Sequence, residues 1–267
     1  MLNKVPEVTI YFWIIKALCT TVGETAADYL NTTLNFGLGM TSVVMSVLLI
    51  IALAYQFWTR KYTPWIYWLA VVLISVVGTL ITDNLTDNFG VSLETTTVMF
   101  SIVLALVFAV WYWVEKTVSI HSIVTTGREA FYWLAILFTF ALGTSAGDLS
   151  AEKFDLGYLT SVGIFAGFIA IVTLAHYTMK WHLGSRHRHL TRNAVLAFWL
   201  AYILTRPLGA SIGDYLSQAQ SDGGLGLGTT ITSFIFLGAI LVLVIYLTLT
   251  KMDQTPPEVI QADLAEQ

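Results

Sequence analysis

Apolar residues fill most of the chain in long stretches that are separated by short polar links. A helix needs about 20 residues to cross a hydrocarbon core of about 30 Å. Stretches of this length lie near residues 8–30, 38–58, 64–85, 93–113, 129–149, 156–178, 194–217 and 227–249. The pattern predicts an all-α polytopic membrane protein with eight transmembrane helices. One transmembrane domain would span residues 1–250, followed by a polar, disordered cytoplasmic tail, residues 251–267.

The odd-numbered stretches align with one another without a gap. They read "FWIIKALCTTVGETAADYL", "YWLAVVLISVVGTLITDNL", "YWLAILFTFALGTSAGDLS" and "FWLAYILTRPLGASIGDYL". Each has an aromatic residue before a Trp, then a Gly ten residues after the Trp and an Asp five residues after the Gly. Four of the nine aspartates in the chain therefore share one offset: Asp28, Asp83, Asp148 and Asp214.

The even-numbered stretches also correspond, because each opens with Gly and hydroxyl residues, as in "FGLGMTS" and "LGLGTTITS". The repeating unit is therefore a two-helix hairpin, with copies near residues 8–60, 63–117, 128–181 and 194–250. Two crossings return the chain to the side where it began, so the four repeats are parallel. This predicts a pseudo-symmetric bundle around an axis along the membrane normal.

This pattern resembles a family of bacterial membrane proteins that are described as four tandem "repeats of unknown function", often labelled uncharacterised membrane-anchored proteins. The resemblance covers about residues 5 to 250 and is carried by the Trp, Gly and Asp offsets, with "TTVGE" and "TRPLGAS". It implies two transmembrane segments per repeat and a bacterial cytoplasmic (inner) membrane. It implies no settled activity, so a function must be inferred from the residues.

The distribution of Lys and Arg predicts the orientation. The termini and the links after the second, fourth and sixth stretches hold ten of these residues, whereas the other links hold only Lys153. Cytoplasmic loops carry the excess of Lys and Arg. Both termini are therefore predicted to be cytoplasmic, and the repeat Trp residues are expected in an aromatic belt at that interface. The same place is expected for Trp58, Trp65, Trp111, Trp113 and Trp181.

Composition agrees with a protein whose main partner is the lipid bilayer. Hydrophobic residues make up 56% of the chain and charged residues 11%, with a mean hydropathy of +0.73. These values lie outside the range of soluble domains and give no sign of a nucleic-acid partner. A single cysteine, Cys19, excludes an internal disulfide. The chain has no HExxH, GxSxG or nucleotide-loop motif, so we predict that it is not an enzyme.

Each odd stretch carries polar residues at intervals of four, which places them on one helical face. Glu24, Lys16 and Arg206 stand out, because a charge within the bilayer costs about 2.5 to 3.5 kcal/mol. The Asp would lie roughly 22 Å from the Trp along the helix. The residues eight and four positions before each Asp are Thr20 and Glu24, Ser75 and Thr79, Phe140 and Thr144, and Arg206 and Ala210. Lys16 lies four positions before Thr20 in the first repeat.

Five acidic groups face two basic groups along these faces. Carboxylates with hydroxyls are the oxygen ligands that Mg, Ca or Mn prefer, and the absence of Cys and His from the faces disfavours Zn or Cu. We predict a transporter or channel for a small cation, with no resident cofactor. A divalent metal is one candidate cargo, and coupling to protons is one candidate mechanism. The binding residues would be Lys16, Thr20, Glu24, Asp28, Thr79, Asp83, Thr144, Asp148, Arg206 and Asp214, with Glu24 and the four aspartates on the metal.

Three alternatives remain open at this stage. Lys16 and Arg206 suit the carboxylate or phosphate of a small anionic or zwitterionic organic solute. A membrane scaffold would instead hold its charges neutralised within a sealed core. The repeated aspartates also fit a structural role, in which each accepts backbone N–H groups from the start of the next helix. The positions of the acidic and basic side chains relative to one another distinguish these alternatives.

Overall fold

The computed structural model describes residues 3–183 and 187–254, and these residues form helices and loops without a strand. Eight α-helices are present in the described part of the chain. They are α1 (Ile10–Asp28), α2 (Gly37–Trp58), α3 (Pro64–Asp83), α4 (Leu93–Glu115), α5 (Thr126–Asp148), α6 (Tyr158–Leu183), α7 (His187–Ser217) and α8 (Thr229–Thr250). Their bounds lie within a few residues of the predicted stretches, except that α7 begins earlier.

Local chemistry explains several of the helix starts. The hydroxyl of Thr9 accepts a hydrogen bond from the backbone N–H of Phe12 before α1, and Thr125 does the same for Arg128 before α5. Pro64 is the first residue of α3, where its missing N–H is not needed. Short polar links with these residues therefore set where α1, α3 and α5 begin.

Most helices are long and apolar enough to cross a membrane. Among the described residues, α2 to α8 meet this condition. Helix α1 does not, because Lys16 and Glu24 lower the hydropathy of its 19 residues. The even helices expose large apolar side chains along their outer faces, such as Ile50 of α2, Ile102 of α4 and Leu241 of α8. Apolar exposure on this scale is expected of a protein that is solvated by lipid.

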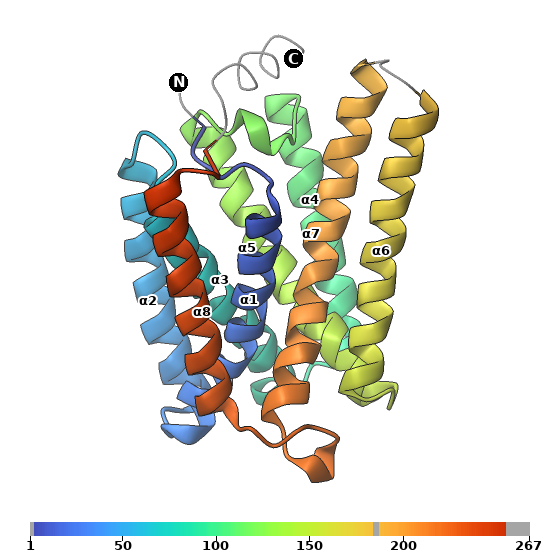
Figure 1. Cartoon of the computed structure of the whole chain (residues 1–267). Coiled ribbons are helices and arrows are strands. Elements are labelled where there is room, and N and C mark those ends of the chain that lie inside the picture. The colour runs from blue at the N-terminus through green and yellow to red at the C-terminus, as the bar shows by residue number, and fades with distance from the viewer. Residues whose placement is uncertain (1–2, 184–186, 255–267) are drawn as a thin grey trace.

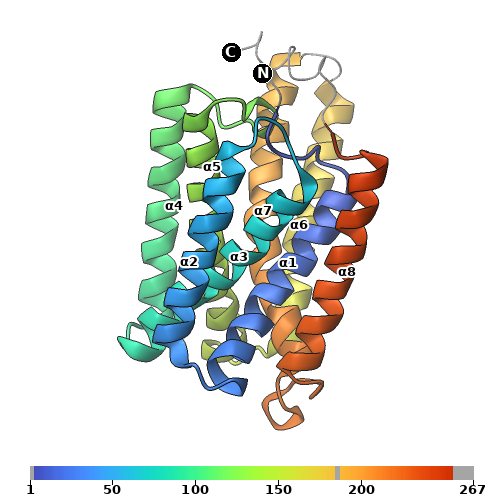
Figure 2. The same ribbon diagram turned by 90° about the vertical axis from the view of Figure 1, so that its left-hand side faces the viewer.

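The odd helices form the interior of the bundle. Helix α1 packs against α3 and α7, and α5 packs against the same two helices, so the four make a closed ring. Each even helix packs outside this ring on the odd helix of the next hairpin: α2 on α3, α4 on α5 and α6 on α7. Helix α8 returns to pack on α1 (Figures 1 and 2). The polar faces of the odd helices are therefore kept away from lipid.

Each repeated glycine leaves space for one side chain of the next odd helix, and we call this space a socket. A Cβ atom added at any of these glycines would lie 1.8 to 2.6 Å from a side chain of the next odd helix. The residue that fills the socket always lies eight positions before the Asp of its own repeat. The pairs are Gly23 with Ser75, Gly78 with Phe140, Gly143 with Arg206 and Gly209 with Thr20. Small residues of this kind let helix backbones approach one another closely in a membrane protein.

The expected aromatic belt is wrong for most of the repeat tryptophans. Trp68, Trp133 and Trp199 are buried inside the bundle. They pack with the aromatic residues that precede them in the repeats, such as Tyr67 and Tyr132. The offset of the Trp therefore reflects interior packing. Trp111 is also buried, against Trp199, whereas Trp58, Trp65, Trp113 and Trp181 are exposed.

The first and last described residues lie at the same end of the bundle, which we call the termini end (Figure 1). The predicted tail is packed at its beginning. Asp253 is buried, its carboxylate accepts a hydrogen bond from the hydroxyl of Tyr62, and its carbonyl accepts one from the backbone N–H of Glu7 at 2.8 Å. Burial raises the pKa of the Asp253 carboxyl above its ordinary value. The remainder of the tail, residues 255–267, lies outside the described residues.

The socket contact predicts a large difference between two glycine substitutions. Gly78→Ala would place a methyl group 2.6 Å from Cβ of Phe140, and overpacking of this kind costs about 1 to 3 kcal/mol. We expect a lower thermal unfolding midpoint in detergent micelles.

Gly163→Ala is the matched control for this change. Gly163 lies inside α6 with no atom within 4 Å of its added Cβ. Ala has the higher helix propensity, so the midpoint should stay the same or rise. An equal fall of the unfolding midpoint in both variants would show that the close contact at Gly78 is not what makes its substitution costly.

Candidate functional site

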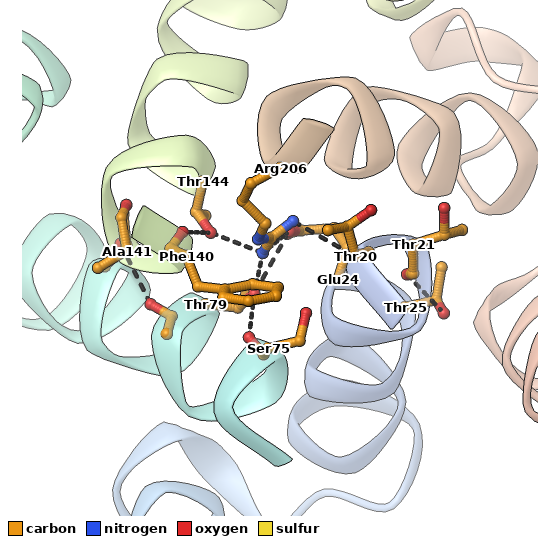
Figure 3. A network of polar contacts seen from close by, with 12 residues as sticks. Thr20, Thr21, Glu24, Thr25, Ser75, Thr79, Phe140, Ala141, Thr144 and Arg206 are labelled. Carbon is orange, nitrogen blue, oxygen red and sulfur yellow. Dashed lines mark hydrogen bonds and ion pairs between the residues drawn. The ribbon is translucent and has the colours of Figure 1, made fainter. Parts of the chain in front are cut away.

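The polar faces of the four inner helices meet at the side chain of Arg206. This residue lies in α7 and is fully buried. Its Nη2 donates hydrogen bonds to Glu24 Oε2 at 2.9 Å, to Thr144 Oγ1 at 2.7 Å and to Thr79 Oγ1 (Figure 3). Its Nη1 donates to the carbonyl of Thr20 at 3.3 Å. One guanidinium therefore contacts the other three inner helices.

The partners of Arg206 share one register in the repeats. Glu24, Thr79 and Thr144 each lie four residues before the Asp of their repeat. The corresponding residue of α7 is Ala210, so Arg206 reaches one turn along the bundle to meet the other three oxygens. We call these four residues, Arg206, Glu24, Thr79 and Thr144, the Arg206 layer. Glu24 and Arg206 form an ion pair that is almost completely buried.

Lys16 lies apart from the carboxylates. It is fully buried, and its Nζ has no hydrogen-bond partner among the described residues. The ammonium lies 4.2 Å from the ring centre of Phe140 and 4.3 Å from that of Tyr202. Two such contacts stabilise a desolvated cation by about 2 kcal/mol each. Lys16 was predicted to be a binding residue together with the carboxylates, but it contacts aromatic rings instead.

Acidic groups from separate repeats come together beyond the Arg206 layer, at the end of the bundle opposite the termini end. One carboxylate oxygen each from Glu24, Asp148 and Asp214 lies within 4.8 Å of the other two. Asp214 is buried, whereas Asp148 is partly exposed. These three residues, which we call the carboxylate cluster, are brought together from α1, α5 and α7. The geometry suits a cation that takes several oxygen ligands.

The remaining predicted acidic residues, Asp28 and Asp83, end α1 and α3 on the same side and are partly exposed. None of the four repeated aspartates has a side-chain hydrogen bond or an ion pair with a described residue. The starts of α2 and α8 have no side-chain cap, and α4 is capped by its own Ser92. The structural role considered for these aspartates is therefore absent at these three helices.

The backbone changes its winding directly after three of these aspartates. Helices α1, α3 and α5 each continue past Asp28, Asp83 and Asp148 as one π-helical turn. Helix α7 instead continues to Ser217 and is followed by a 3₁₀ turn, Gln220–Asp222. Such wide turns are rare and occur frequently at functional sites. The hydrophobic pattern contains no signal for them.

Two cavities are described in the structure, and the predicted site residues line neither. One of about 650 Å³ lies at the termini end between α1, α6 and α7, where Trp13, His176 and Phe198 contribute to its mostly apolar wall. The other, of about 360 Å³, lies beside α2 and α3 near Ser42 and Asn84. The carboxylate cluster, defined by the distances among its oxygens, lies outside both cavities.

A second buried charged group was missed by the sequence reasoning. Glu129, at the start of α5, is fully buried and binds Lys4 with 2.6 Å between Oε2 and Nζ. Glu129 lies four residues before Trp133, and the other repeats have Thr9, Pro64 and Val195 at that position. A residue that occurs in one repeat and near a helix end gives no periodic signal, so its burial could not be predicted.

The buried ion pair predicts a large effect of removing Arg206. Arg206→Met would leave the Glu24 carboxylate buried without its cation, which costs about 3 to 5 kcal/mol. We expect a fall of this size in the free energy of unfolding in mixed micelles. Combining this change with Glu24→Gln should restore part of the loss, because the two effects are coupled.

Lys153→Ala is the control for this prediction. Lys153 and Glu94 are 3.5 Å apart, with side chains about half exposed, so their pair contributes less than about 1 kcal/mol. A loss for Arg206→Met no greater than that of the control would show that the Arg206 layer does not stabilise the bundle.

Comparison with known proteins agrees with the repeat structure. Four stretches, residues 11–62, 66–117, 131–180 and 197–253, match the family model described as Repeat of Unknown Function (DUF347). No curated protein and no solved structure matches the chain. Because the four matches cover most of the chain, it belongs to this family and is built from four tandem copies of its repeat.

Proposed function

We propose that the chain is a membrane transporter for a small cation, and that the carboxylate cluster is where the cation binds. The observation that carries this proposal is the approach of Glu24, Asp148 and Asp214 to within 4.8 Å. Like charges repel at this distance, and among the described residues the only ion pair of the cluster is that of Glu24 with Arg206. A divalent cation would offset this repulsion with oxygen ligands of the type that Mg, Ca and Mn prefer.

The architecture proposed with this function has eight transmembrane helices, α1 included, in a pseudo-symmetric bundle of four parallel hairpins. The cyclic packing of the odd helices and the return of α8 to α1 support this arrangement. The excess of Lys and Arg at the termini end supports a cytoplasmic position for both termini. The carboxylate cluster would then face the outside of a bacterial inner membrane.

Arg206 gives the site a defined resting state. In this conformation its guanidinium neutralises Glu24 and occupies the hydroxyls of Thr79 and Thr144. A cation that binds Glu24 competes with Arg206 for the same carboxylate. The release of Arg206 would loosen a layer that holds the four inner helices together, which couples binding to a change in their packing. A carrier accordingly fits this structure better than an open channel.

The alternatives have less support from the same contacts. A site for an anionic solute needs basic groups that are available, but Arg206 is bound to Glu24 and Lys16 is covered by two aromatic rings. A scaffold fits the Arg206 layer, where the charges are neutralised. It does not account for Asp148 and Asp214, whose side chains have no hydrogen bond or ion pair with a described residue.

Flux into reconstituted vesicles tests the proposal. With Mg²⁺, Ca²⁺ and Mn²⁺ as probes, we expect Glu24→Gln and Asp148→Asn to lower the initial rate for the transported ion by about tenfold or more. A charged contact is worth about 1.5 to 3 kcal/mol, and 1.4 kcal/mol corresponds to a factor of ten.

Asp222→Asn is the matched control for this experiment. Asp222 is an exposed carboxylate in the link that follows α7, outside the cluster. Its rate should equal that of the parent. Equal rates for the parent and both cluster variants, with every ion tested, would refute the proposed site.

A further inference from the structure

The segment before α1 is built into the termini end of the bundle. Asn3, Lys4 and Val5 are buried although they precede the first helix. Asn3 Nδ2 donates to the carbonyl of Ile120 at 3.2 Å, and the backbone N–H of Lys4 donates to the carbonyl of Ile123 at 3.1 Å. These bonds tie the segment to the link between α4 and α5.

The same segment is tied to the neighbouring hairpin. The backbone N–H of Tyr62, in the link between α2 and α3, donates to the carbonyl of Asn3 at 3.1 Å. Near the start of α1, the backbone N–H of Glu7 donates to the carbonyl of Asp253, which follows α8. Residues 3–7 therefore bridge the links of several hairpins at the termini end, at the end of the bundle opposite the carboxylate cluster.

Lys4 places a cation at the centre of this segment's contacts. Its Nζ donates to Glu129 Oε2 at 2.6 Å and to the carbonyl of Phe57 at 3.0 Å. Gln56 Nε2 donates to the other oxygen of Glu129 at 3.1 Å. Gln56 is fully buried, and its Oε1 has no hydrogen-bond partner among the described residues. A carboxylate and a backbone carbonyl thus bind one ammonium, and the amide of Gln56 lies beside the same carboxylate with its oxygen unused.

This arrangement repeats the chemistry of the Arg206 layer at the opposite end of the inner ring. Each end has a buried carboxylate on an inner helix, and each carboxylate is neutralised by a cation that belongs to the chain itself. Glu129 and Thr144 lie on the same helix, about 22 Å apart at 1.5 Å per residue. Buried aromatic residues, including Tyr67 and Tyr132, lie between the two ends.

We propose that Glu129, the Phe57 carbonyl and Gln56 form a second cation site, at the termini end, which Lys4 occupies in this conformation. The oxygens are those of a site for a hard divalent cation. Lys4 acts as a tethered substitute for that ion and holds residues 3–7 across the end of the bundle. The role of this site as the exit of a transport path rests on the proposed function, whereas the site itself does not.

Binding of Mn²⁺ to the full chain in lipid nanodiscs tests this site directly. The background is Glu24→Gln combined with Asp148→Asn and Asp214→Asn, so that the carboxylate cluster does not contribute. Free Mn²⁺ is measured by its electron paramagnetic resonance signal. We expect Lys4→Met in this background to raise the affinity for one Mn²⁺ by about tenfold or more, because a charge that repels the metal is removed. Adding Glu129→Gln should return the affinity to the background value.

Lys61→Met is the matched control, because Lys61 is an exposed base at the same end of the bundle. It should leave the affinity unchanged. Lys4→Gln is a second way to vacate the site and should act like Lys4→Met, with folding checked by size-exclusion chromatography. A folded Lys4 variant that binds Mn²⁺ no better than its background, or that gains affinity that Glu129→Gln does not remove, would overturn the inference.

Vesicle flux with the otherwise native chain separates the two proposals. If both proposals hold, Lys4→Met should raise the initial rate several-fold, because the ion pair of Lys4 with Glu129 no longer holds residues 3–7 across the end of the bundle. A gain in Mn²⁺ binding with no flux in any variant would refute the transport function and keep the second site. Flux that depends on Glu24, without a Glu129-dependent gain in Mn²⁺ binding, would refute the second site and keep the function.

Discussion

A guanidinium buried among four helices is stable only if nearby oxygens accept its N–H groups, since an unpaired charge inside a membrane protein costs several kcal/mol. The two Nη groups of Arg206 meet this requirement with two acceptors from α1 and one each from α3 and α5. A helix that slid or rotated by one residue would withdraw its acceptor. The pairing therefore fixes the relative register of all four inner helices, and with it the positions of the carboxylates beyond.

The sockets make this register possible. Gly143 accepts the stem of Arg206 directly against the backbone of α5, so that the guanidinium can extend toward the axis of the ring. At the other sockets the same contact receives Thr20, Ser75 or Phe140. One repeated glycine thus supports four different side chains. The close contact at the glycine is the same in all four repeats, whereas the side chain that it receives differs in size and charge.

Much of this organisation could be predicted from the sequence. The hydrophobic lengths gave the helices, and the intervals of four placed Glu24, Thr79, Thr144 and Arg206 on faces that do meet. The partners could not be chosen by spacing alone. Helical periodicity places both Lys16 and Arg206 on the faces that carry acidic groups, yet Lys16 lies between the rings of Phe140 and Tyr202. Tertiary packing decided between them, as it did for the buried tryptophans.

The return of α8 to α1 has a consequence for assembly during synthesis. Helix α1 enters the bilayer first, but two of its neighbours, α7 and α8, are the last to be made. Until they arrive, Glu24 has no guanidinium beside it, and α1 lacks two of the three helices that pack on it. The fourth hairpin therefore closes the inner ring, and a chain without it would leave Glu24 without its cation.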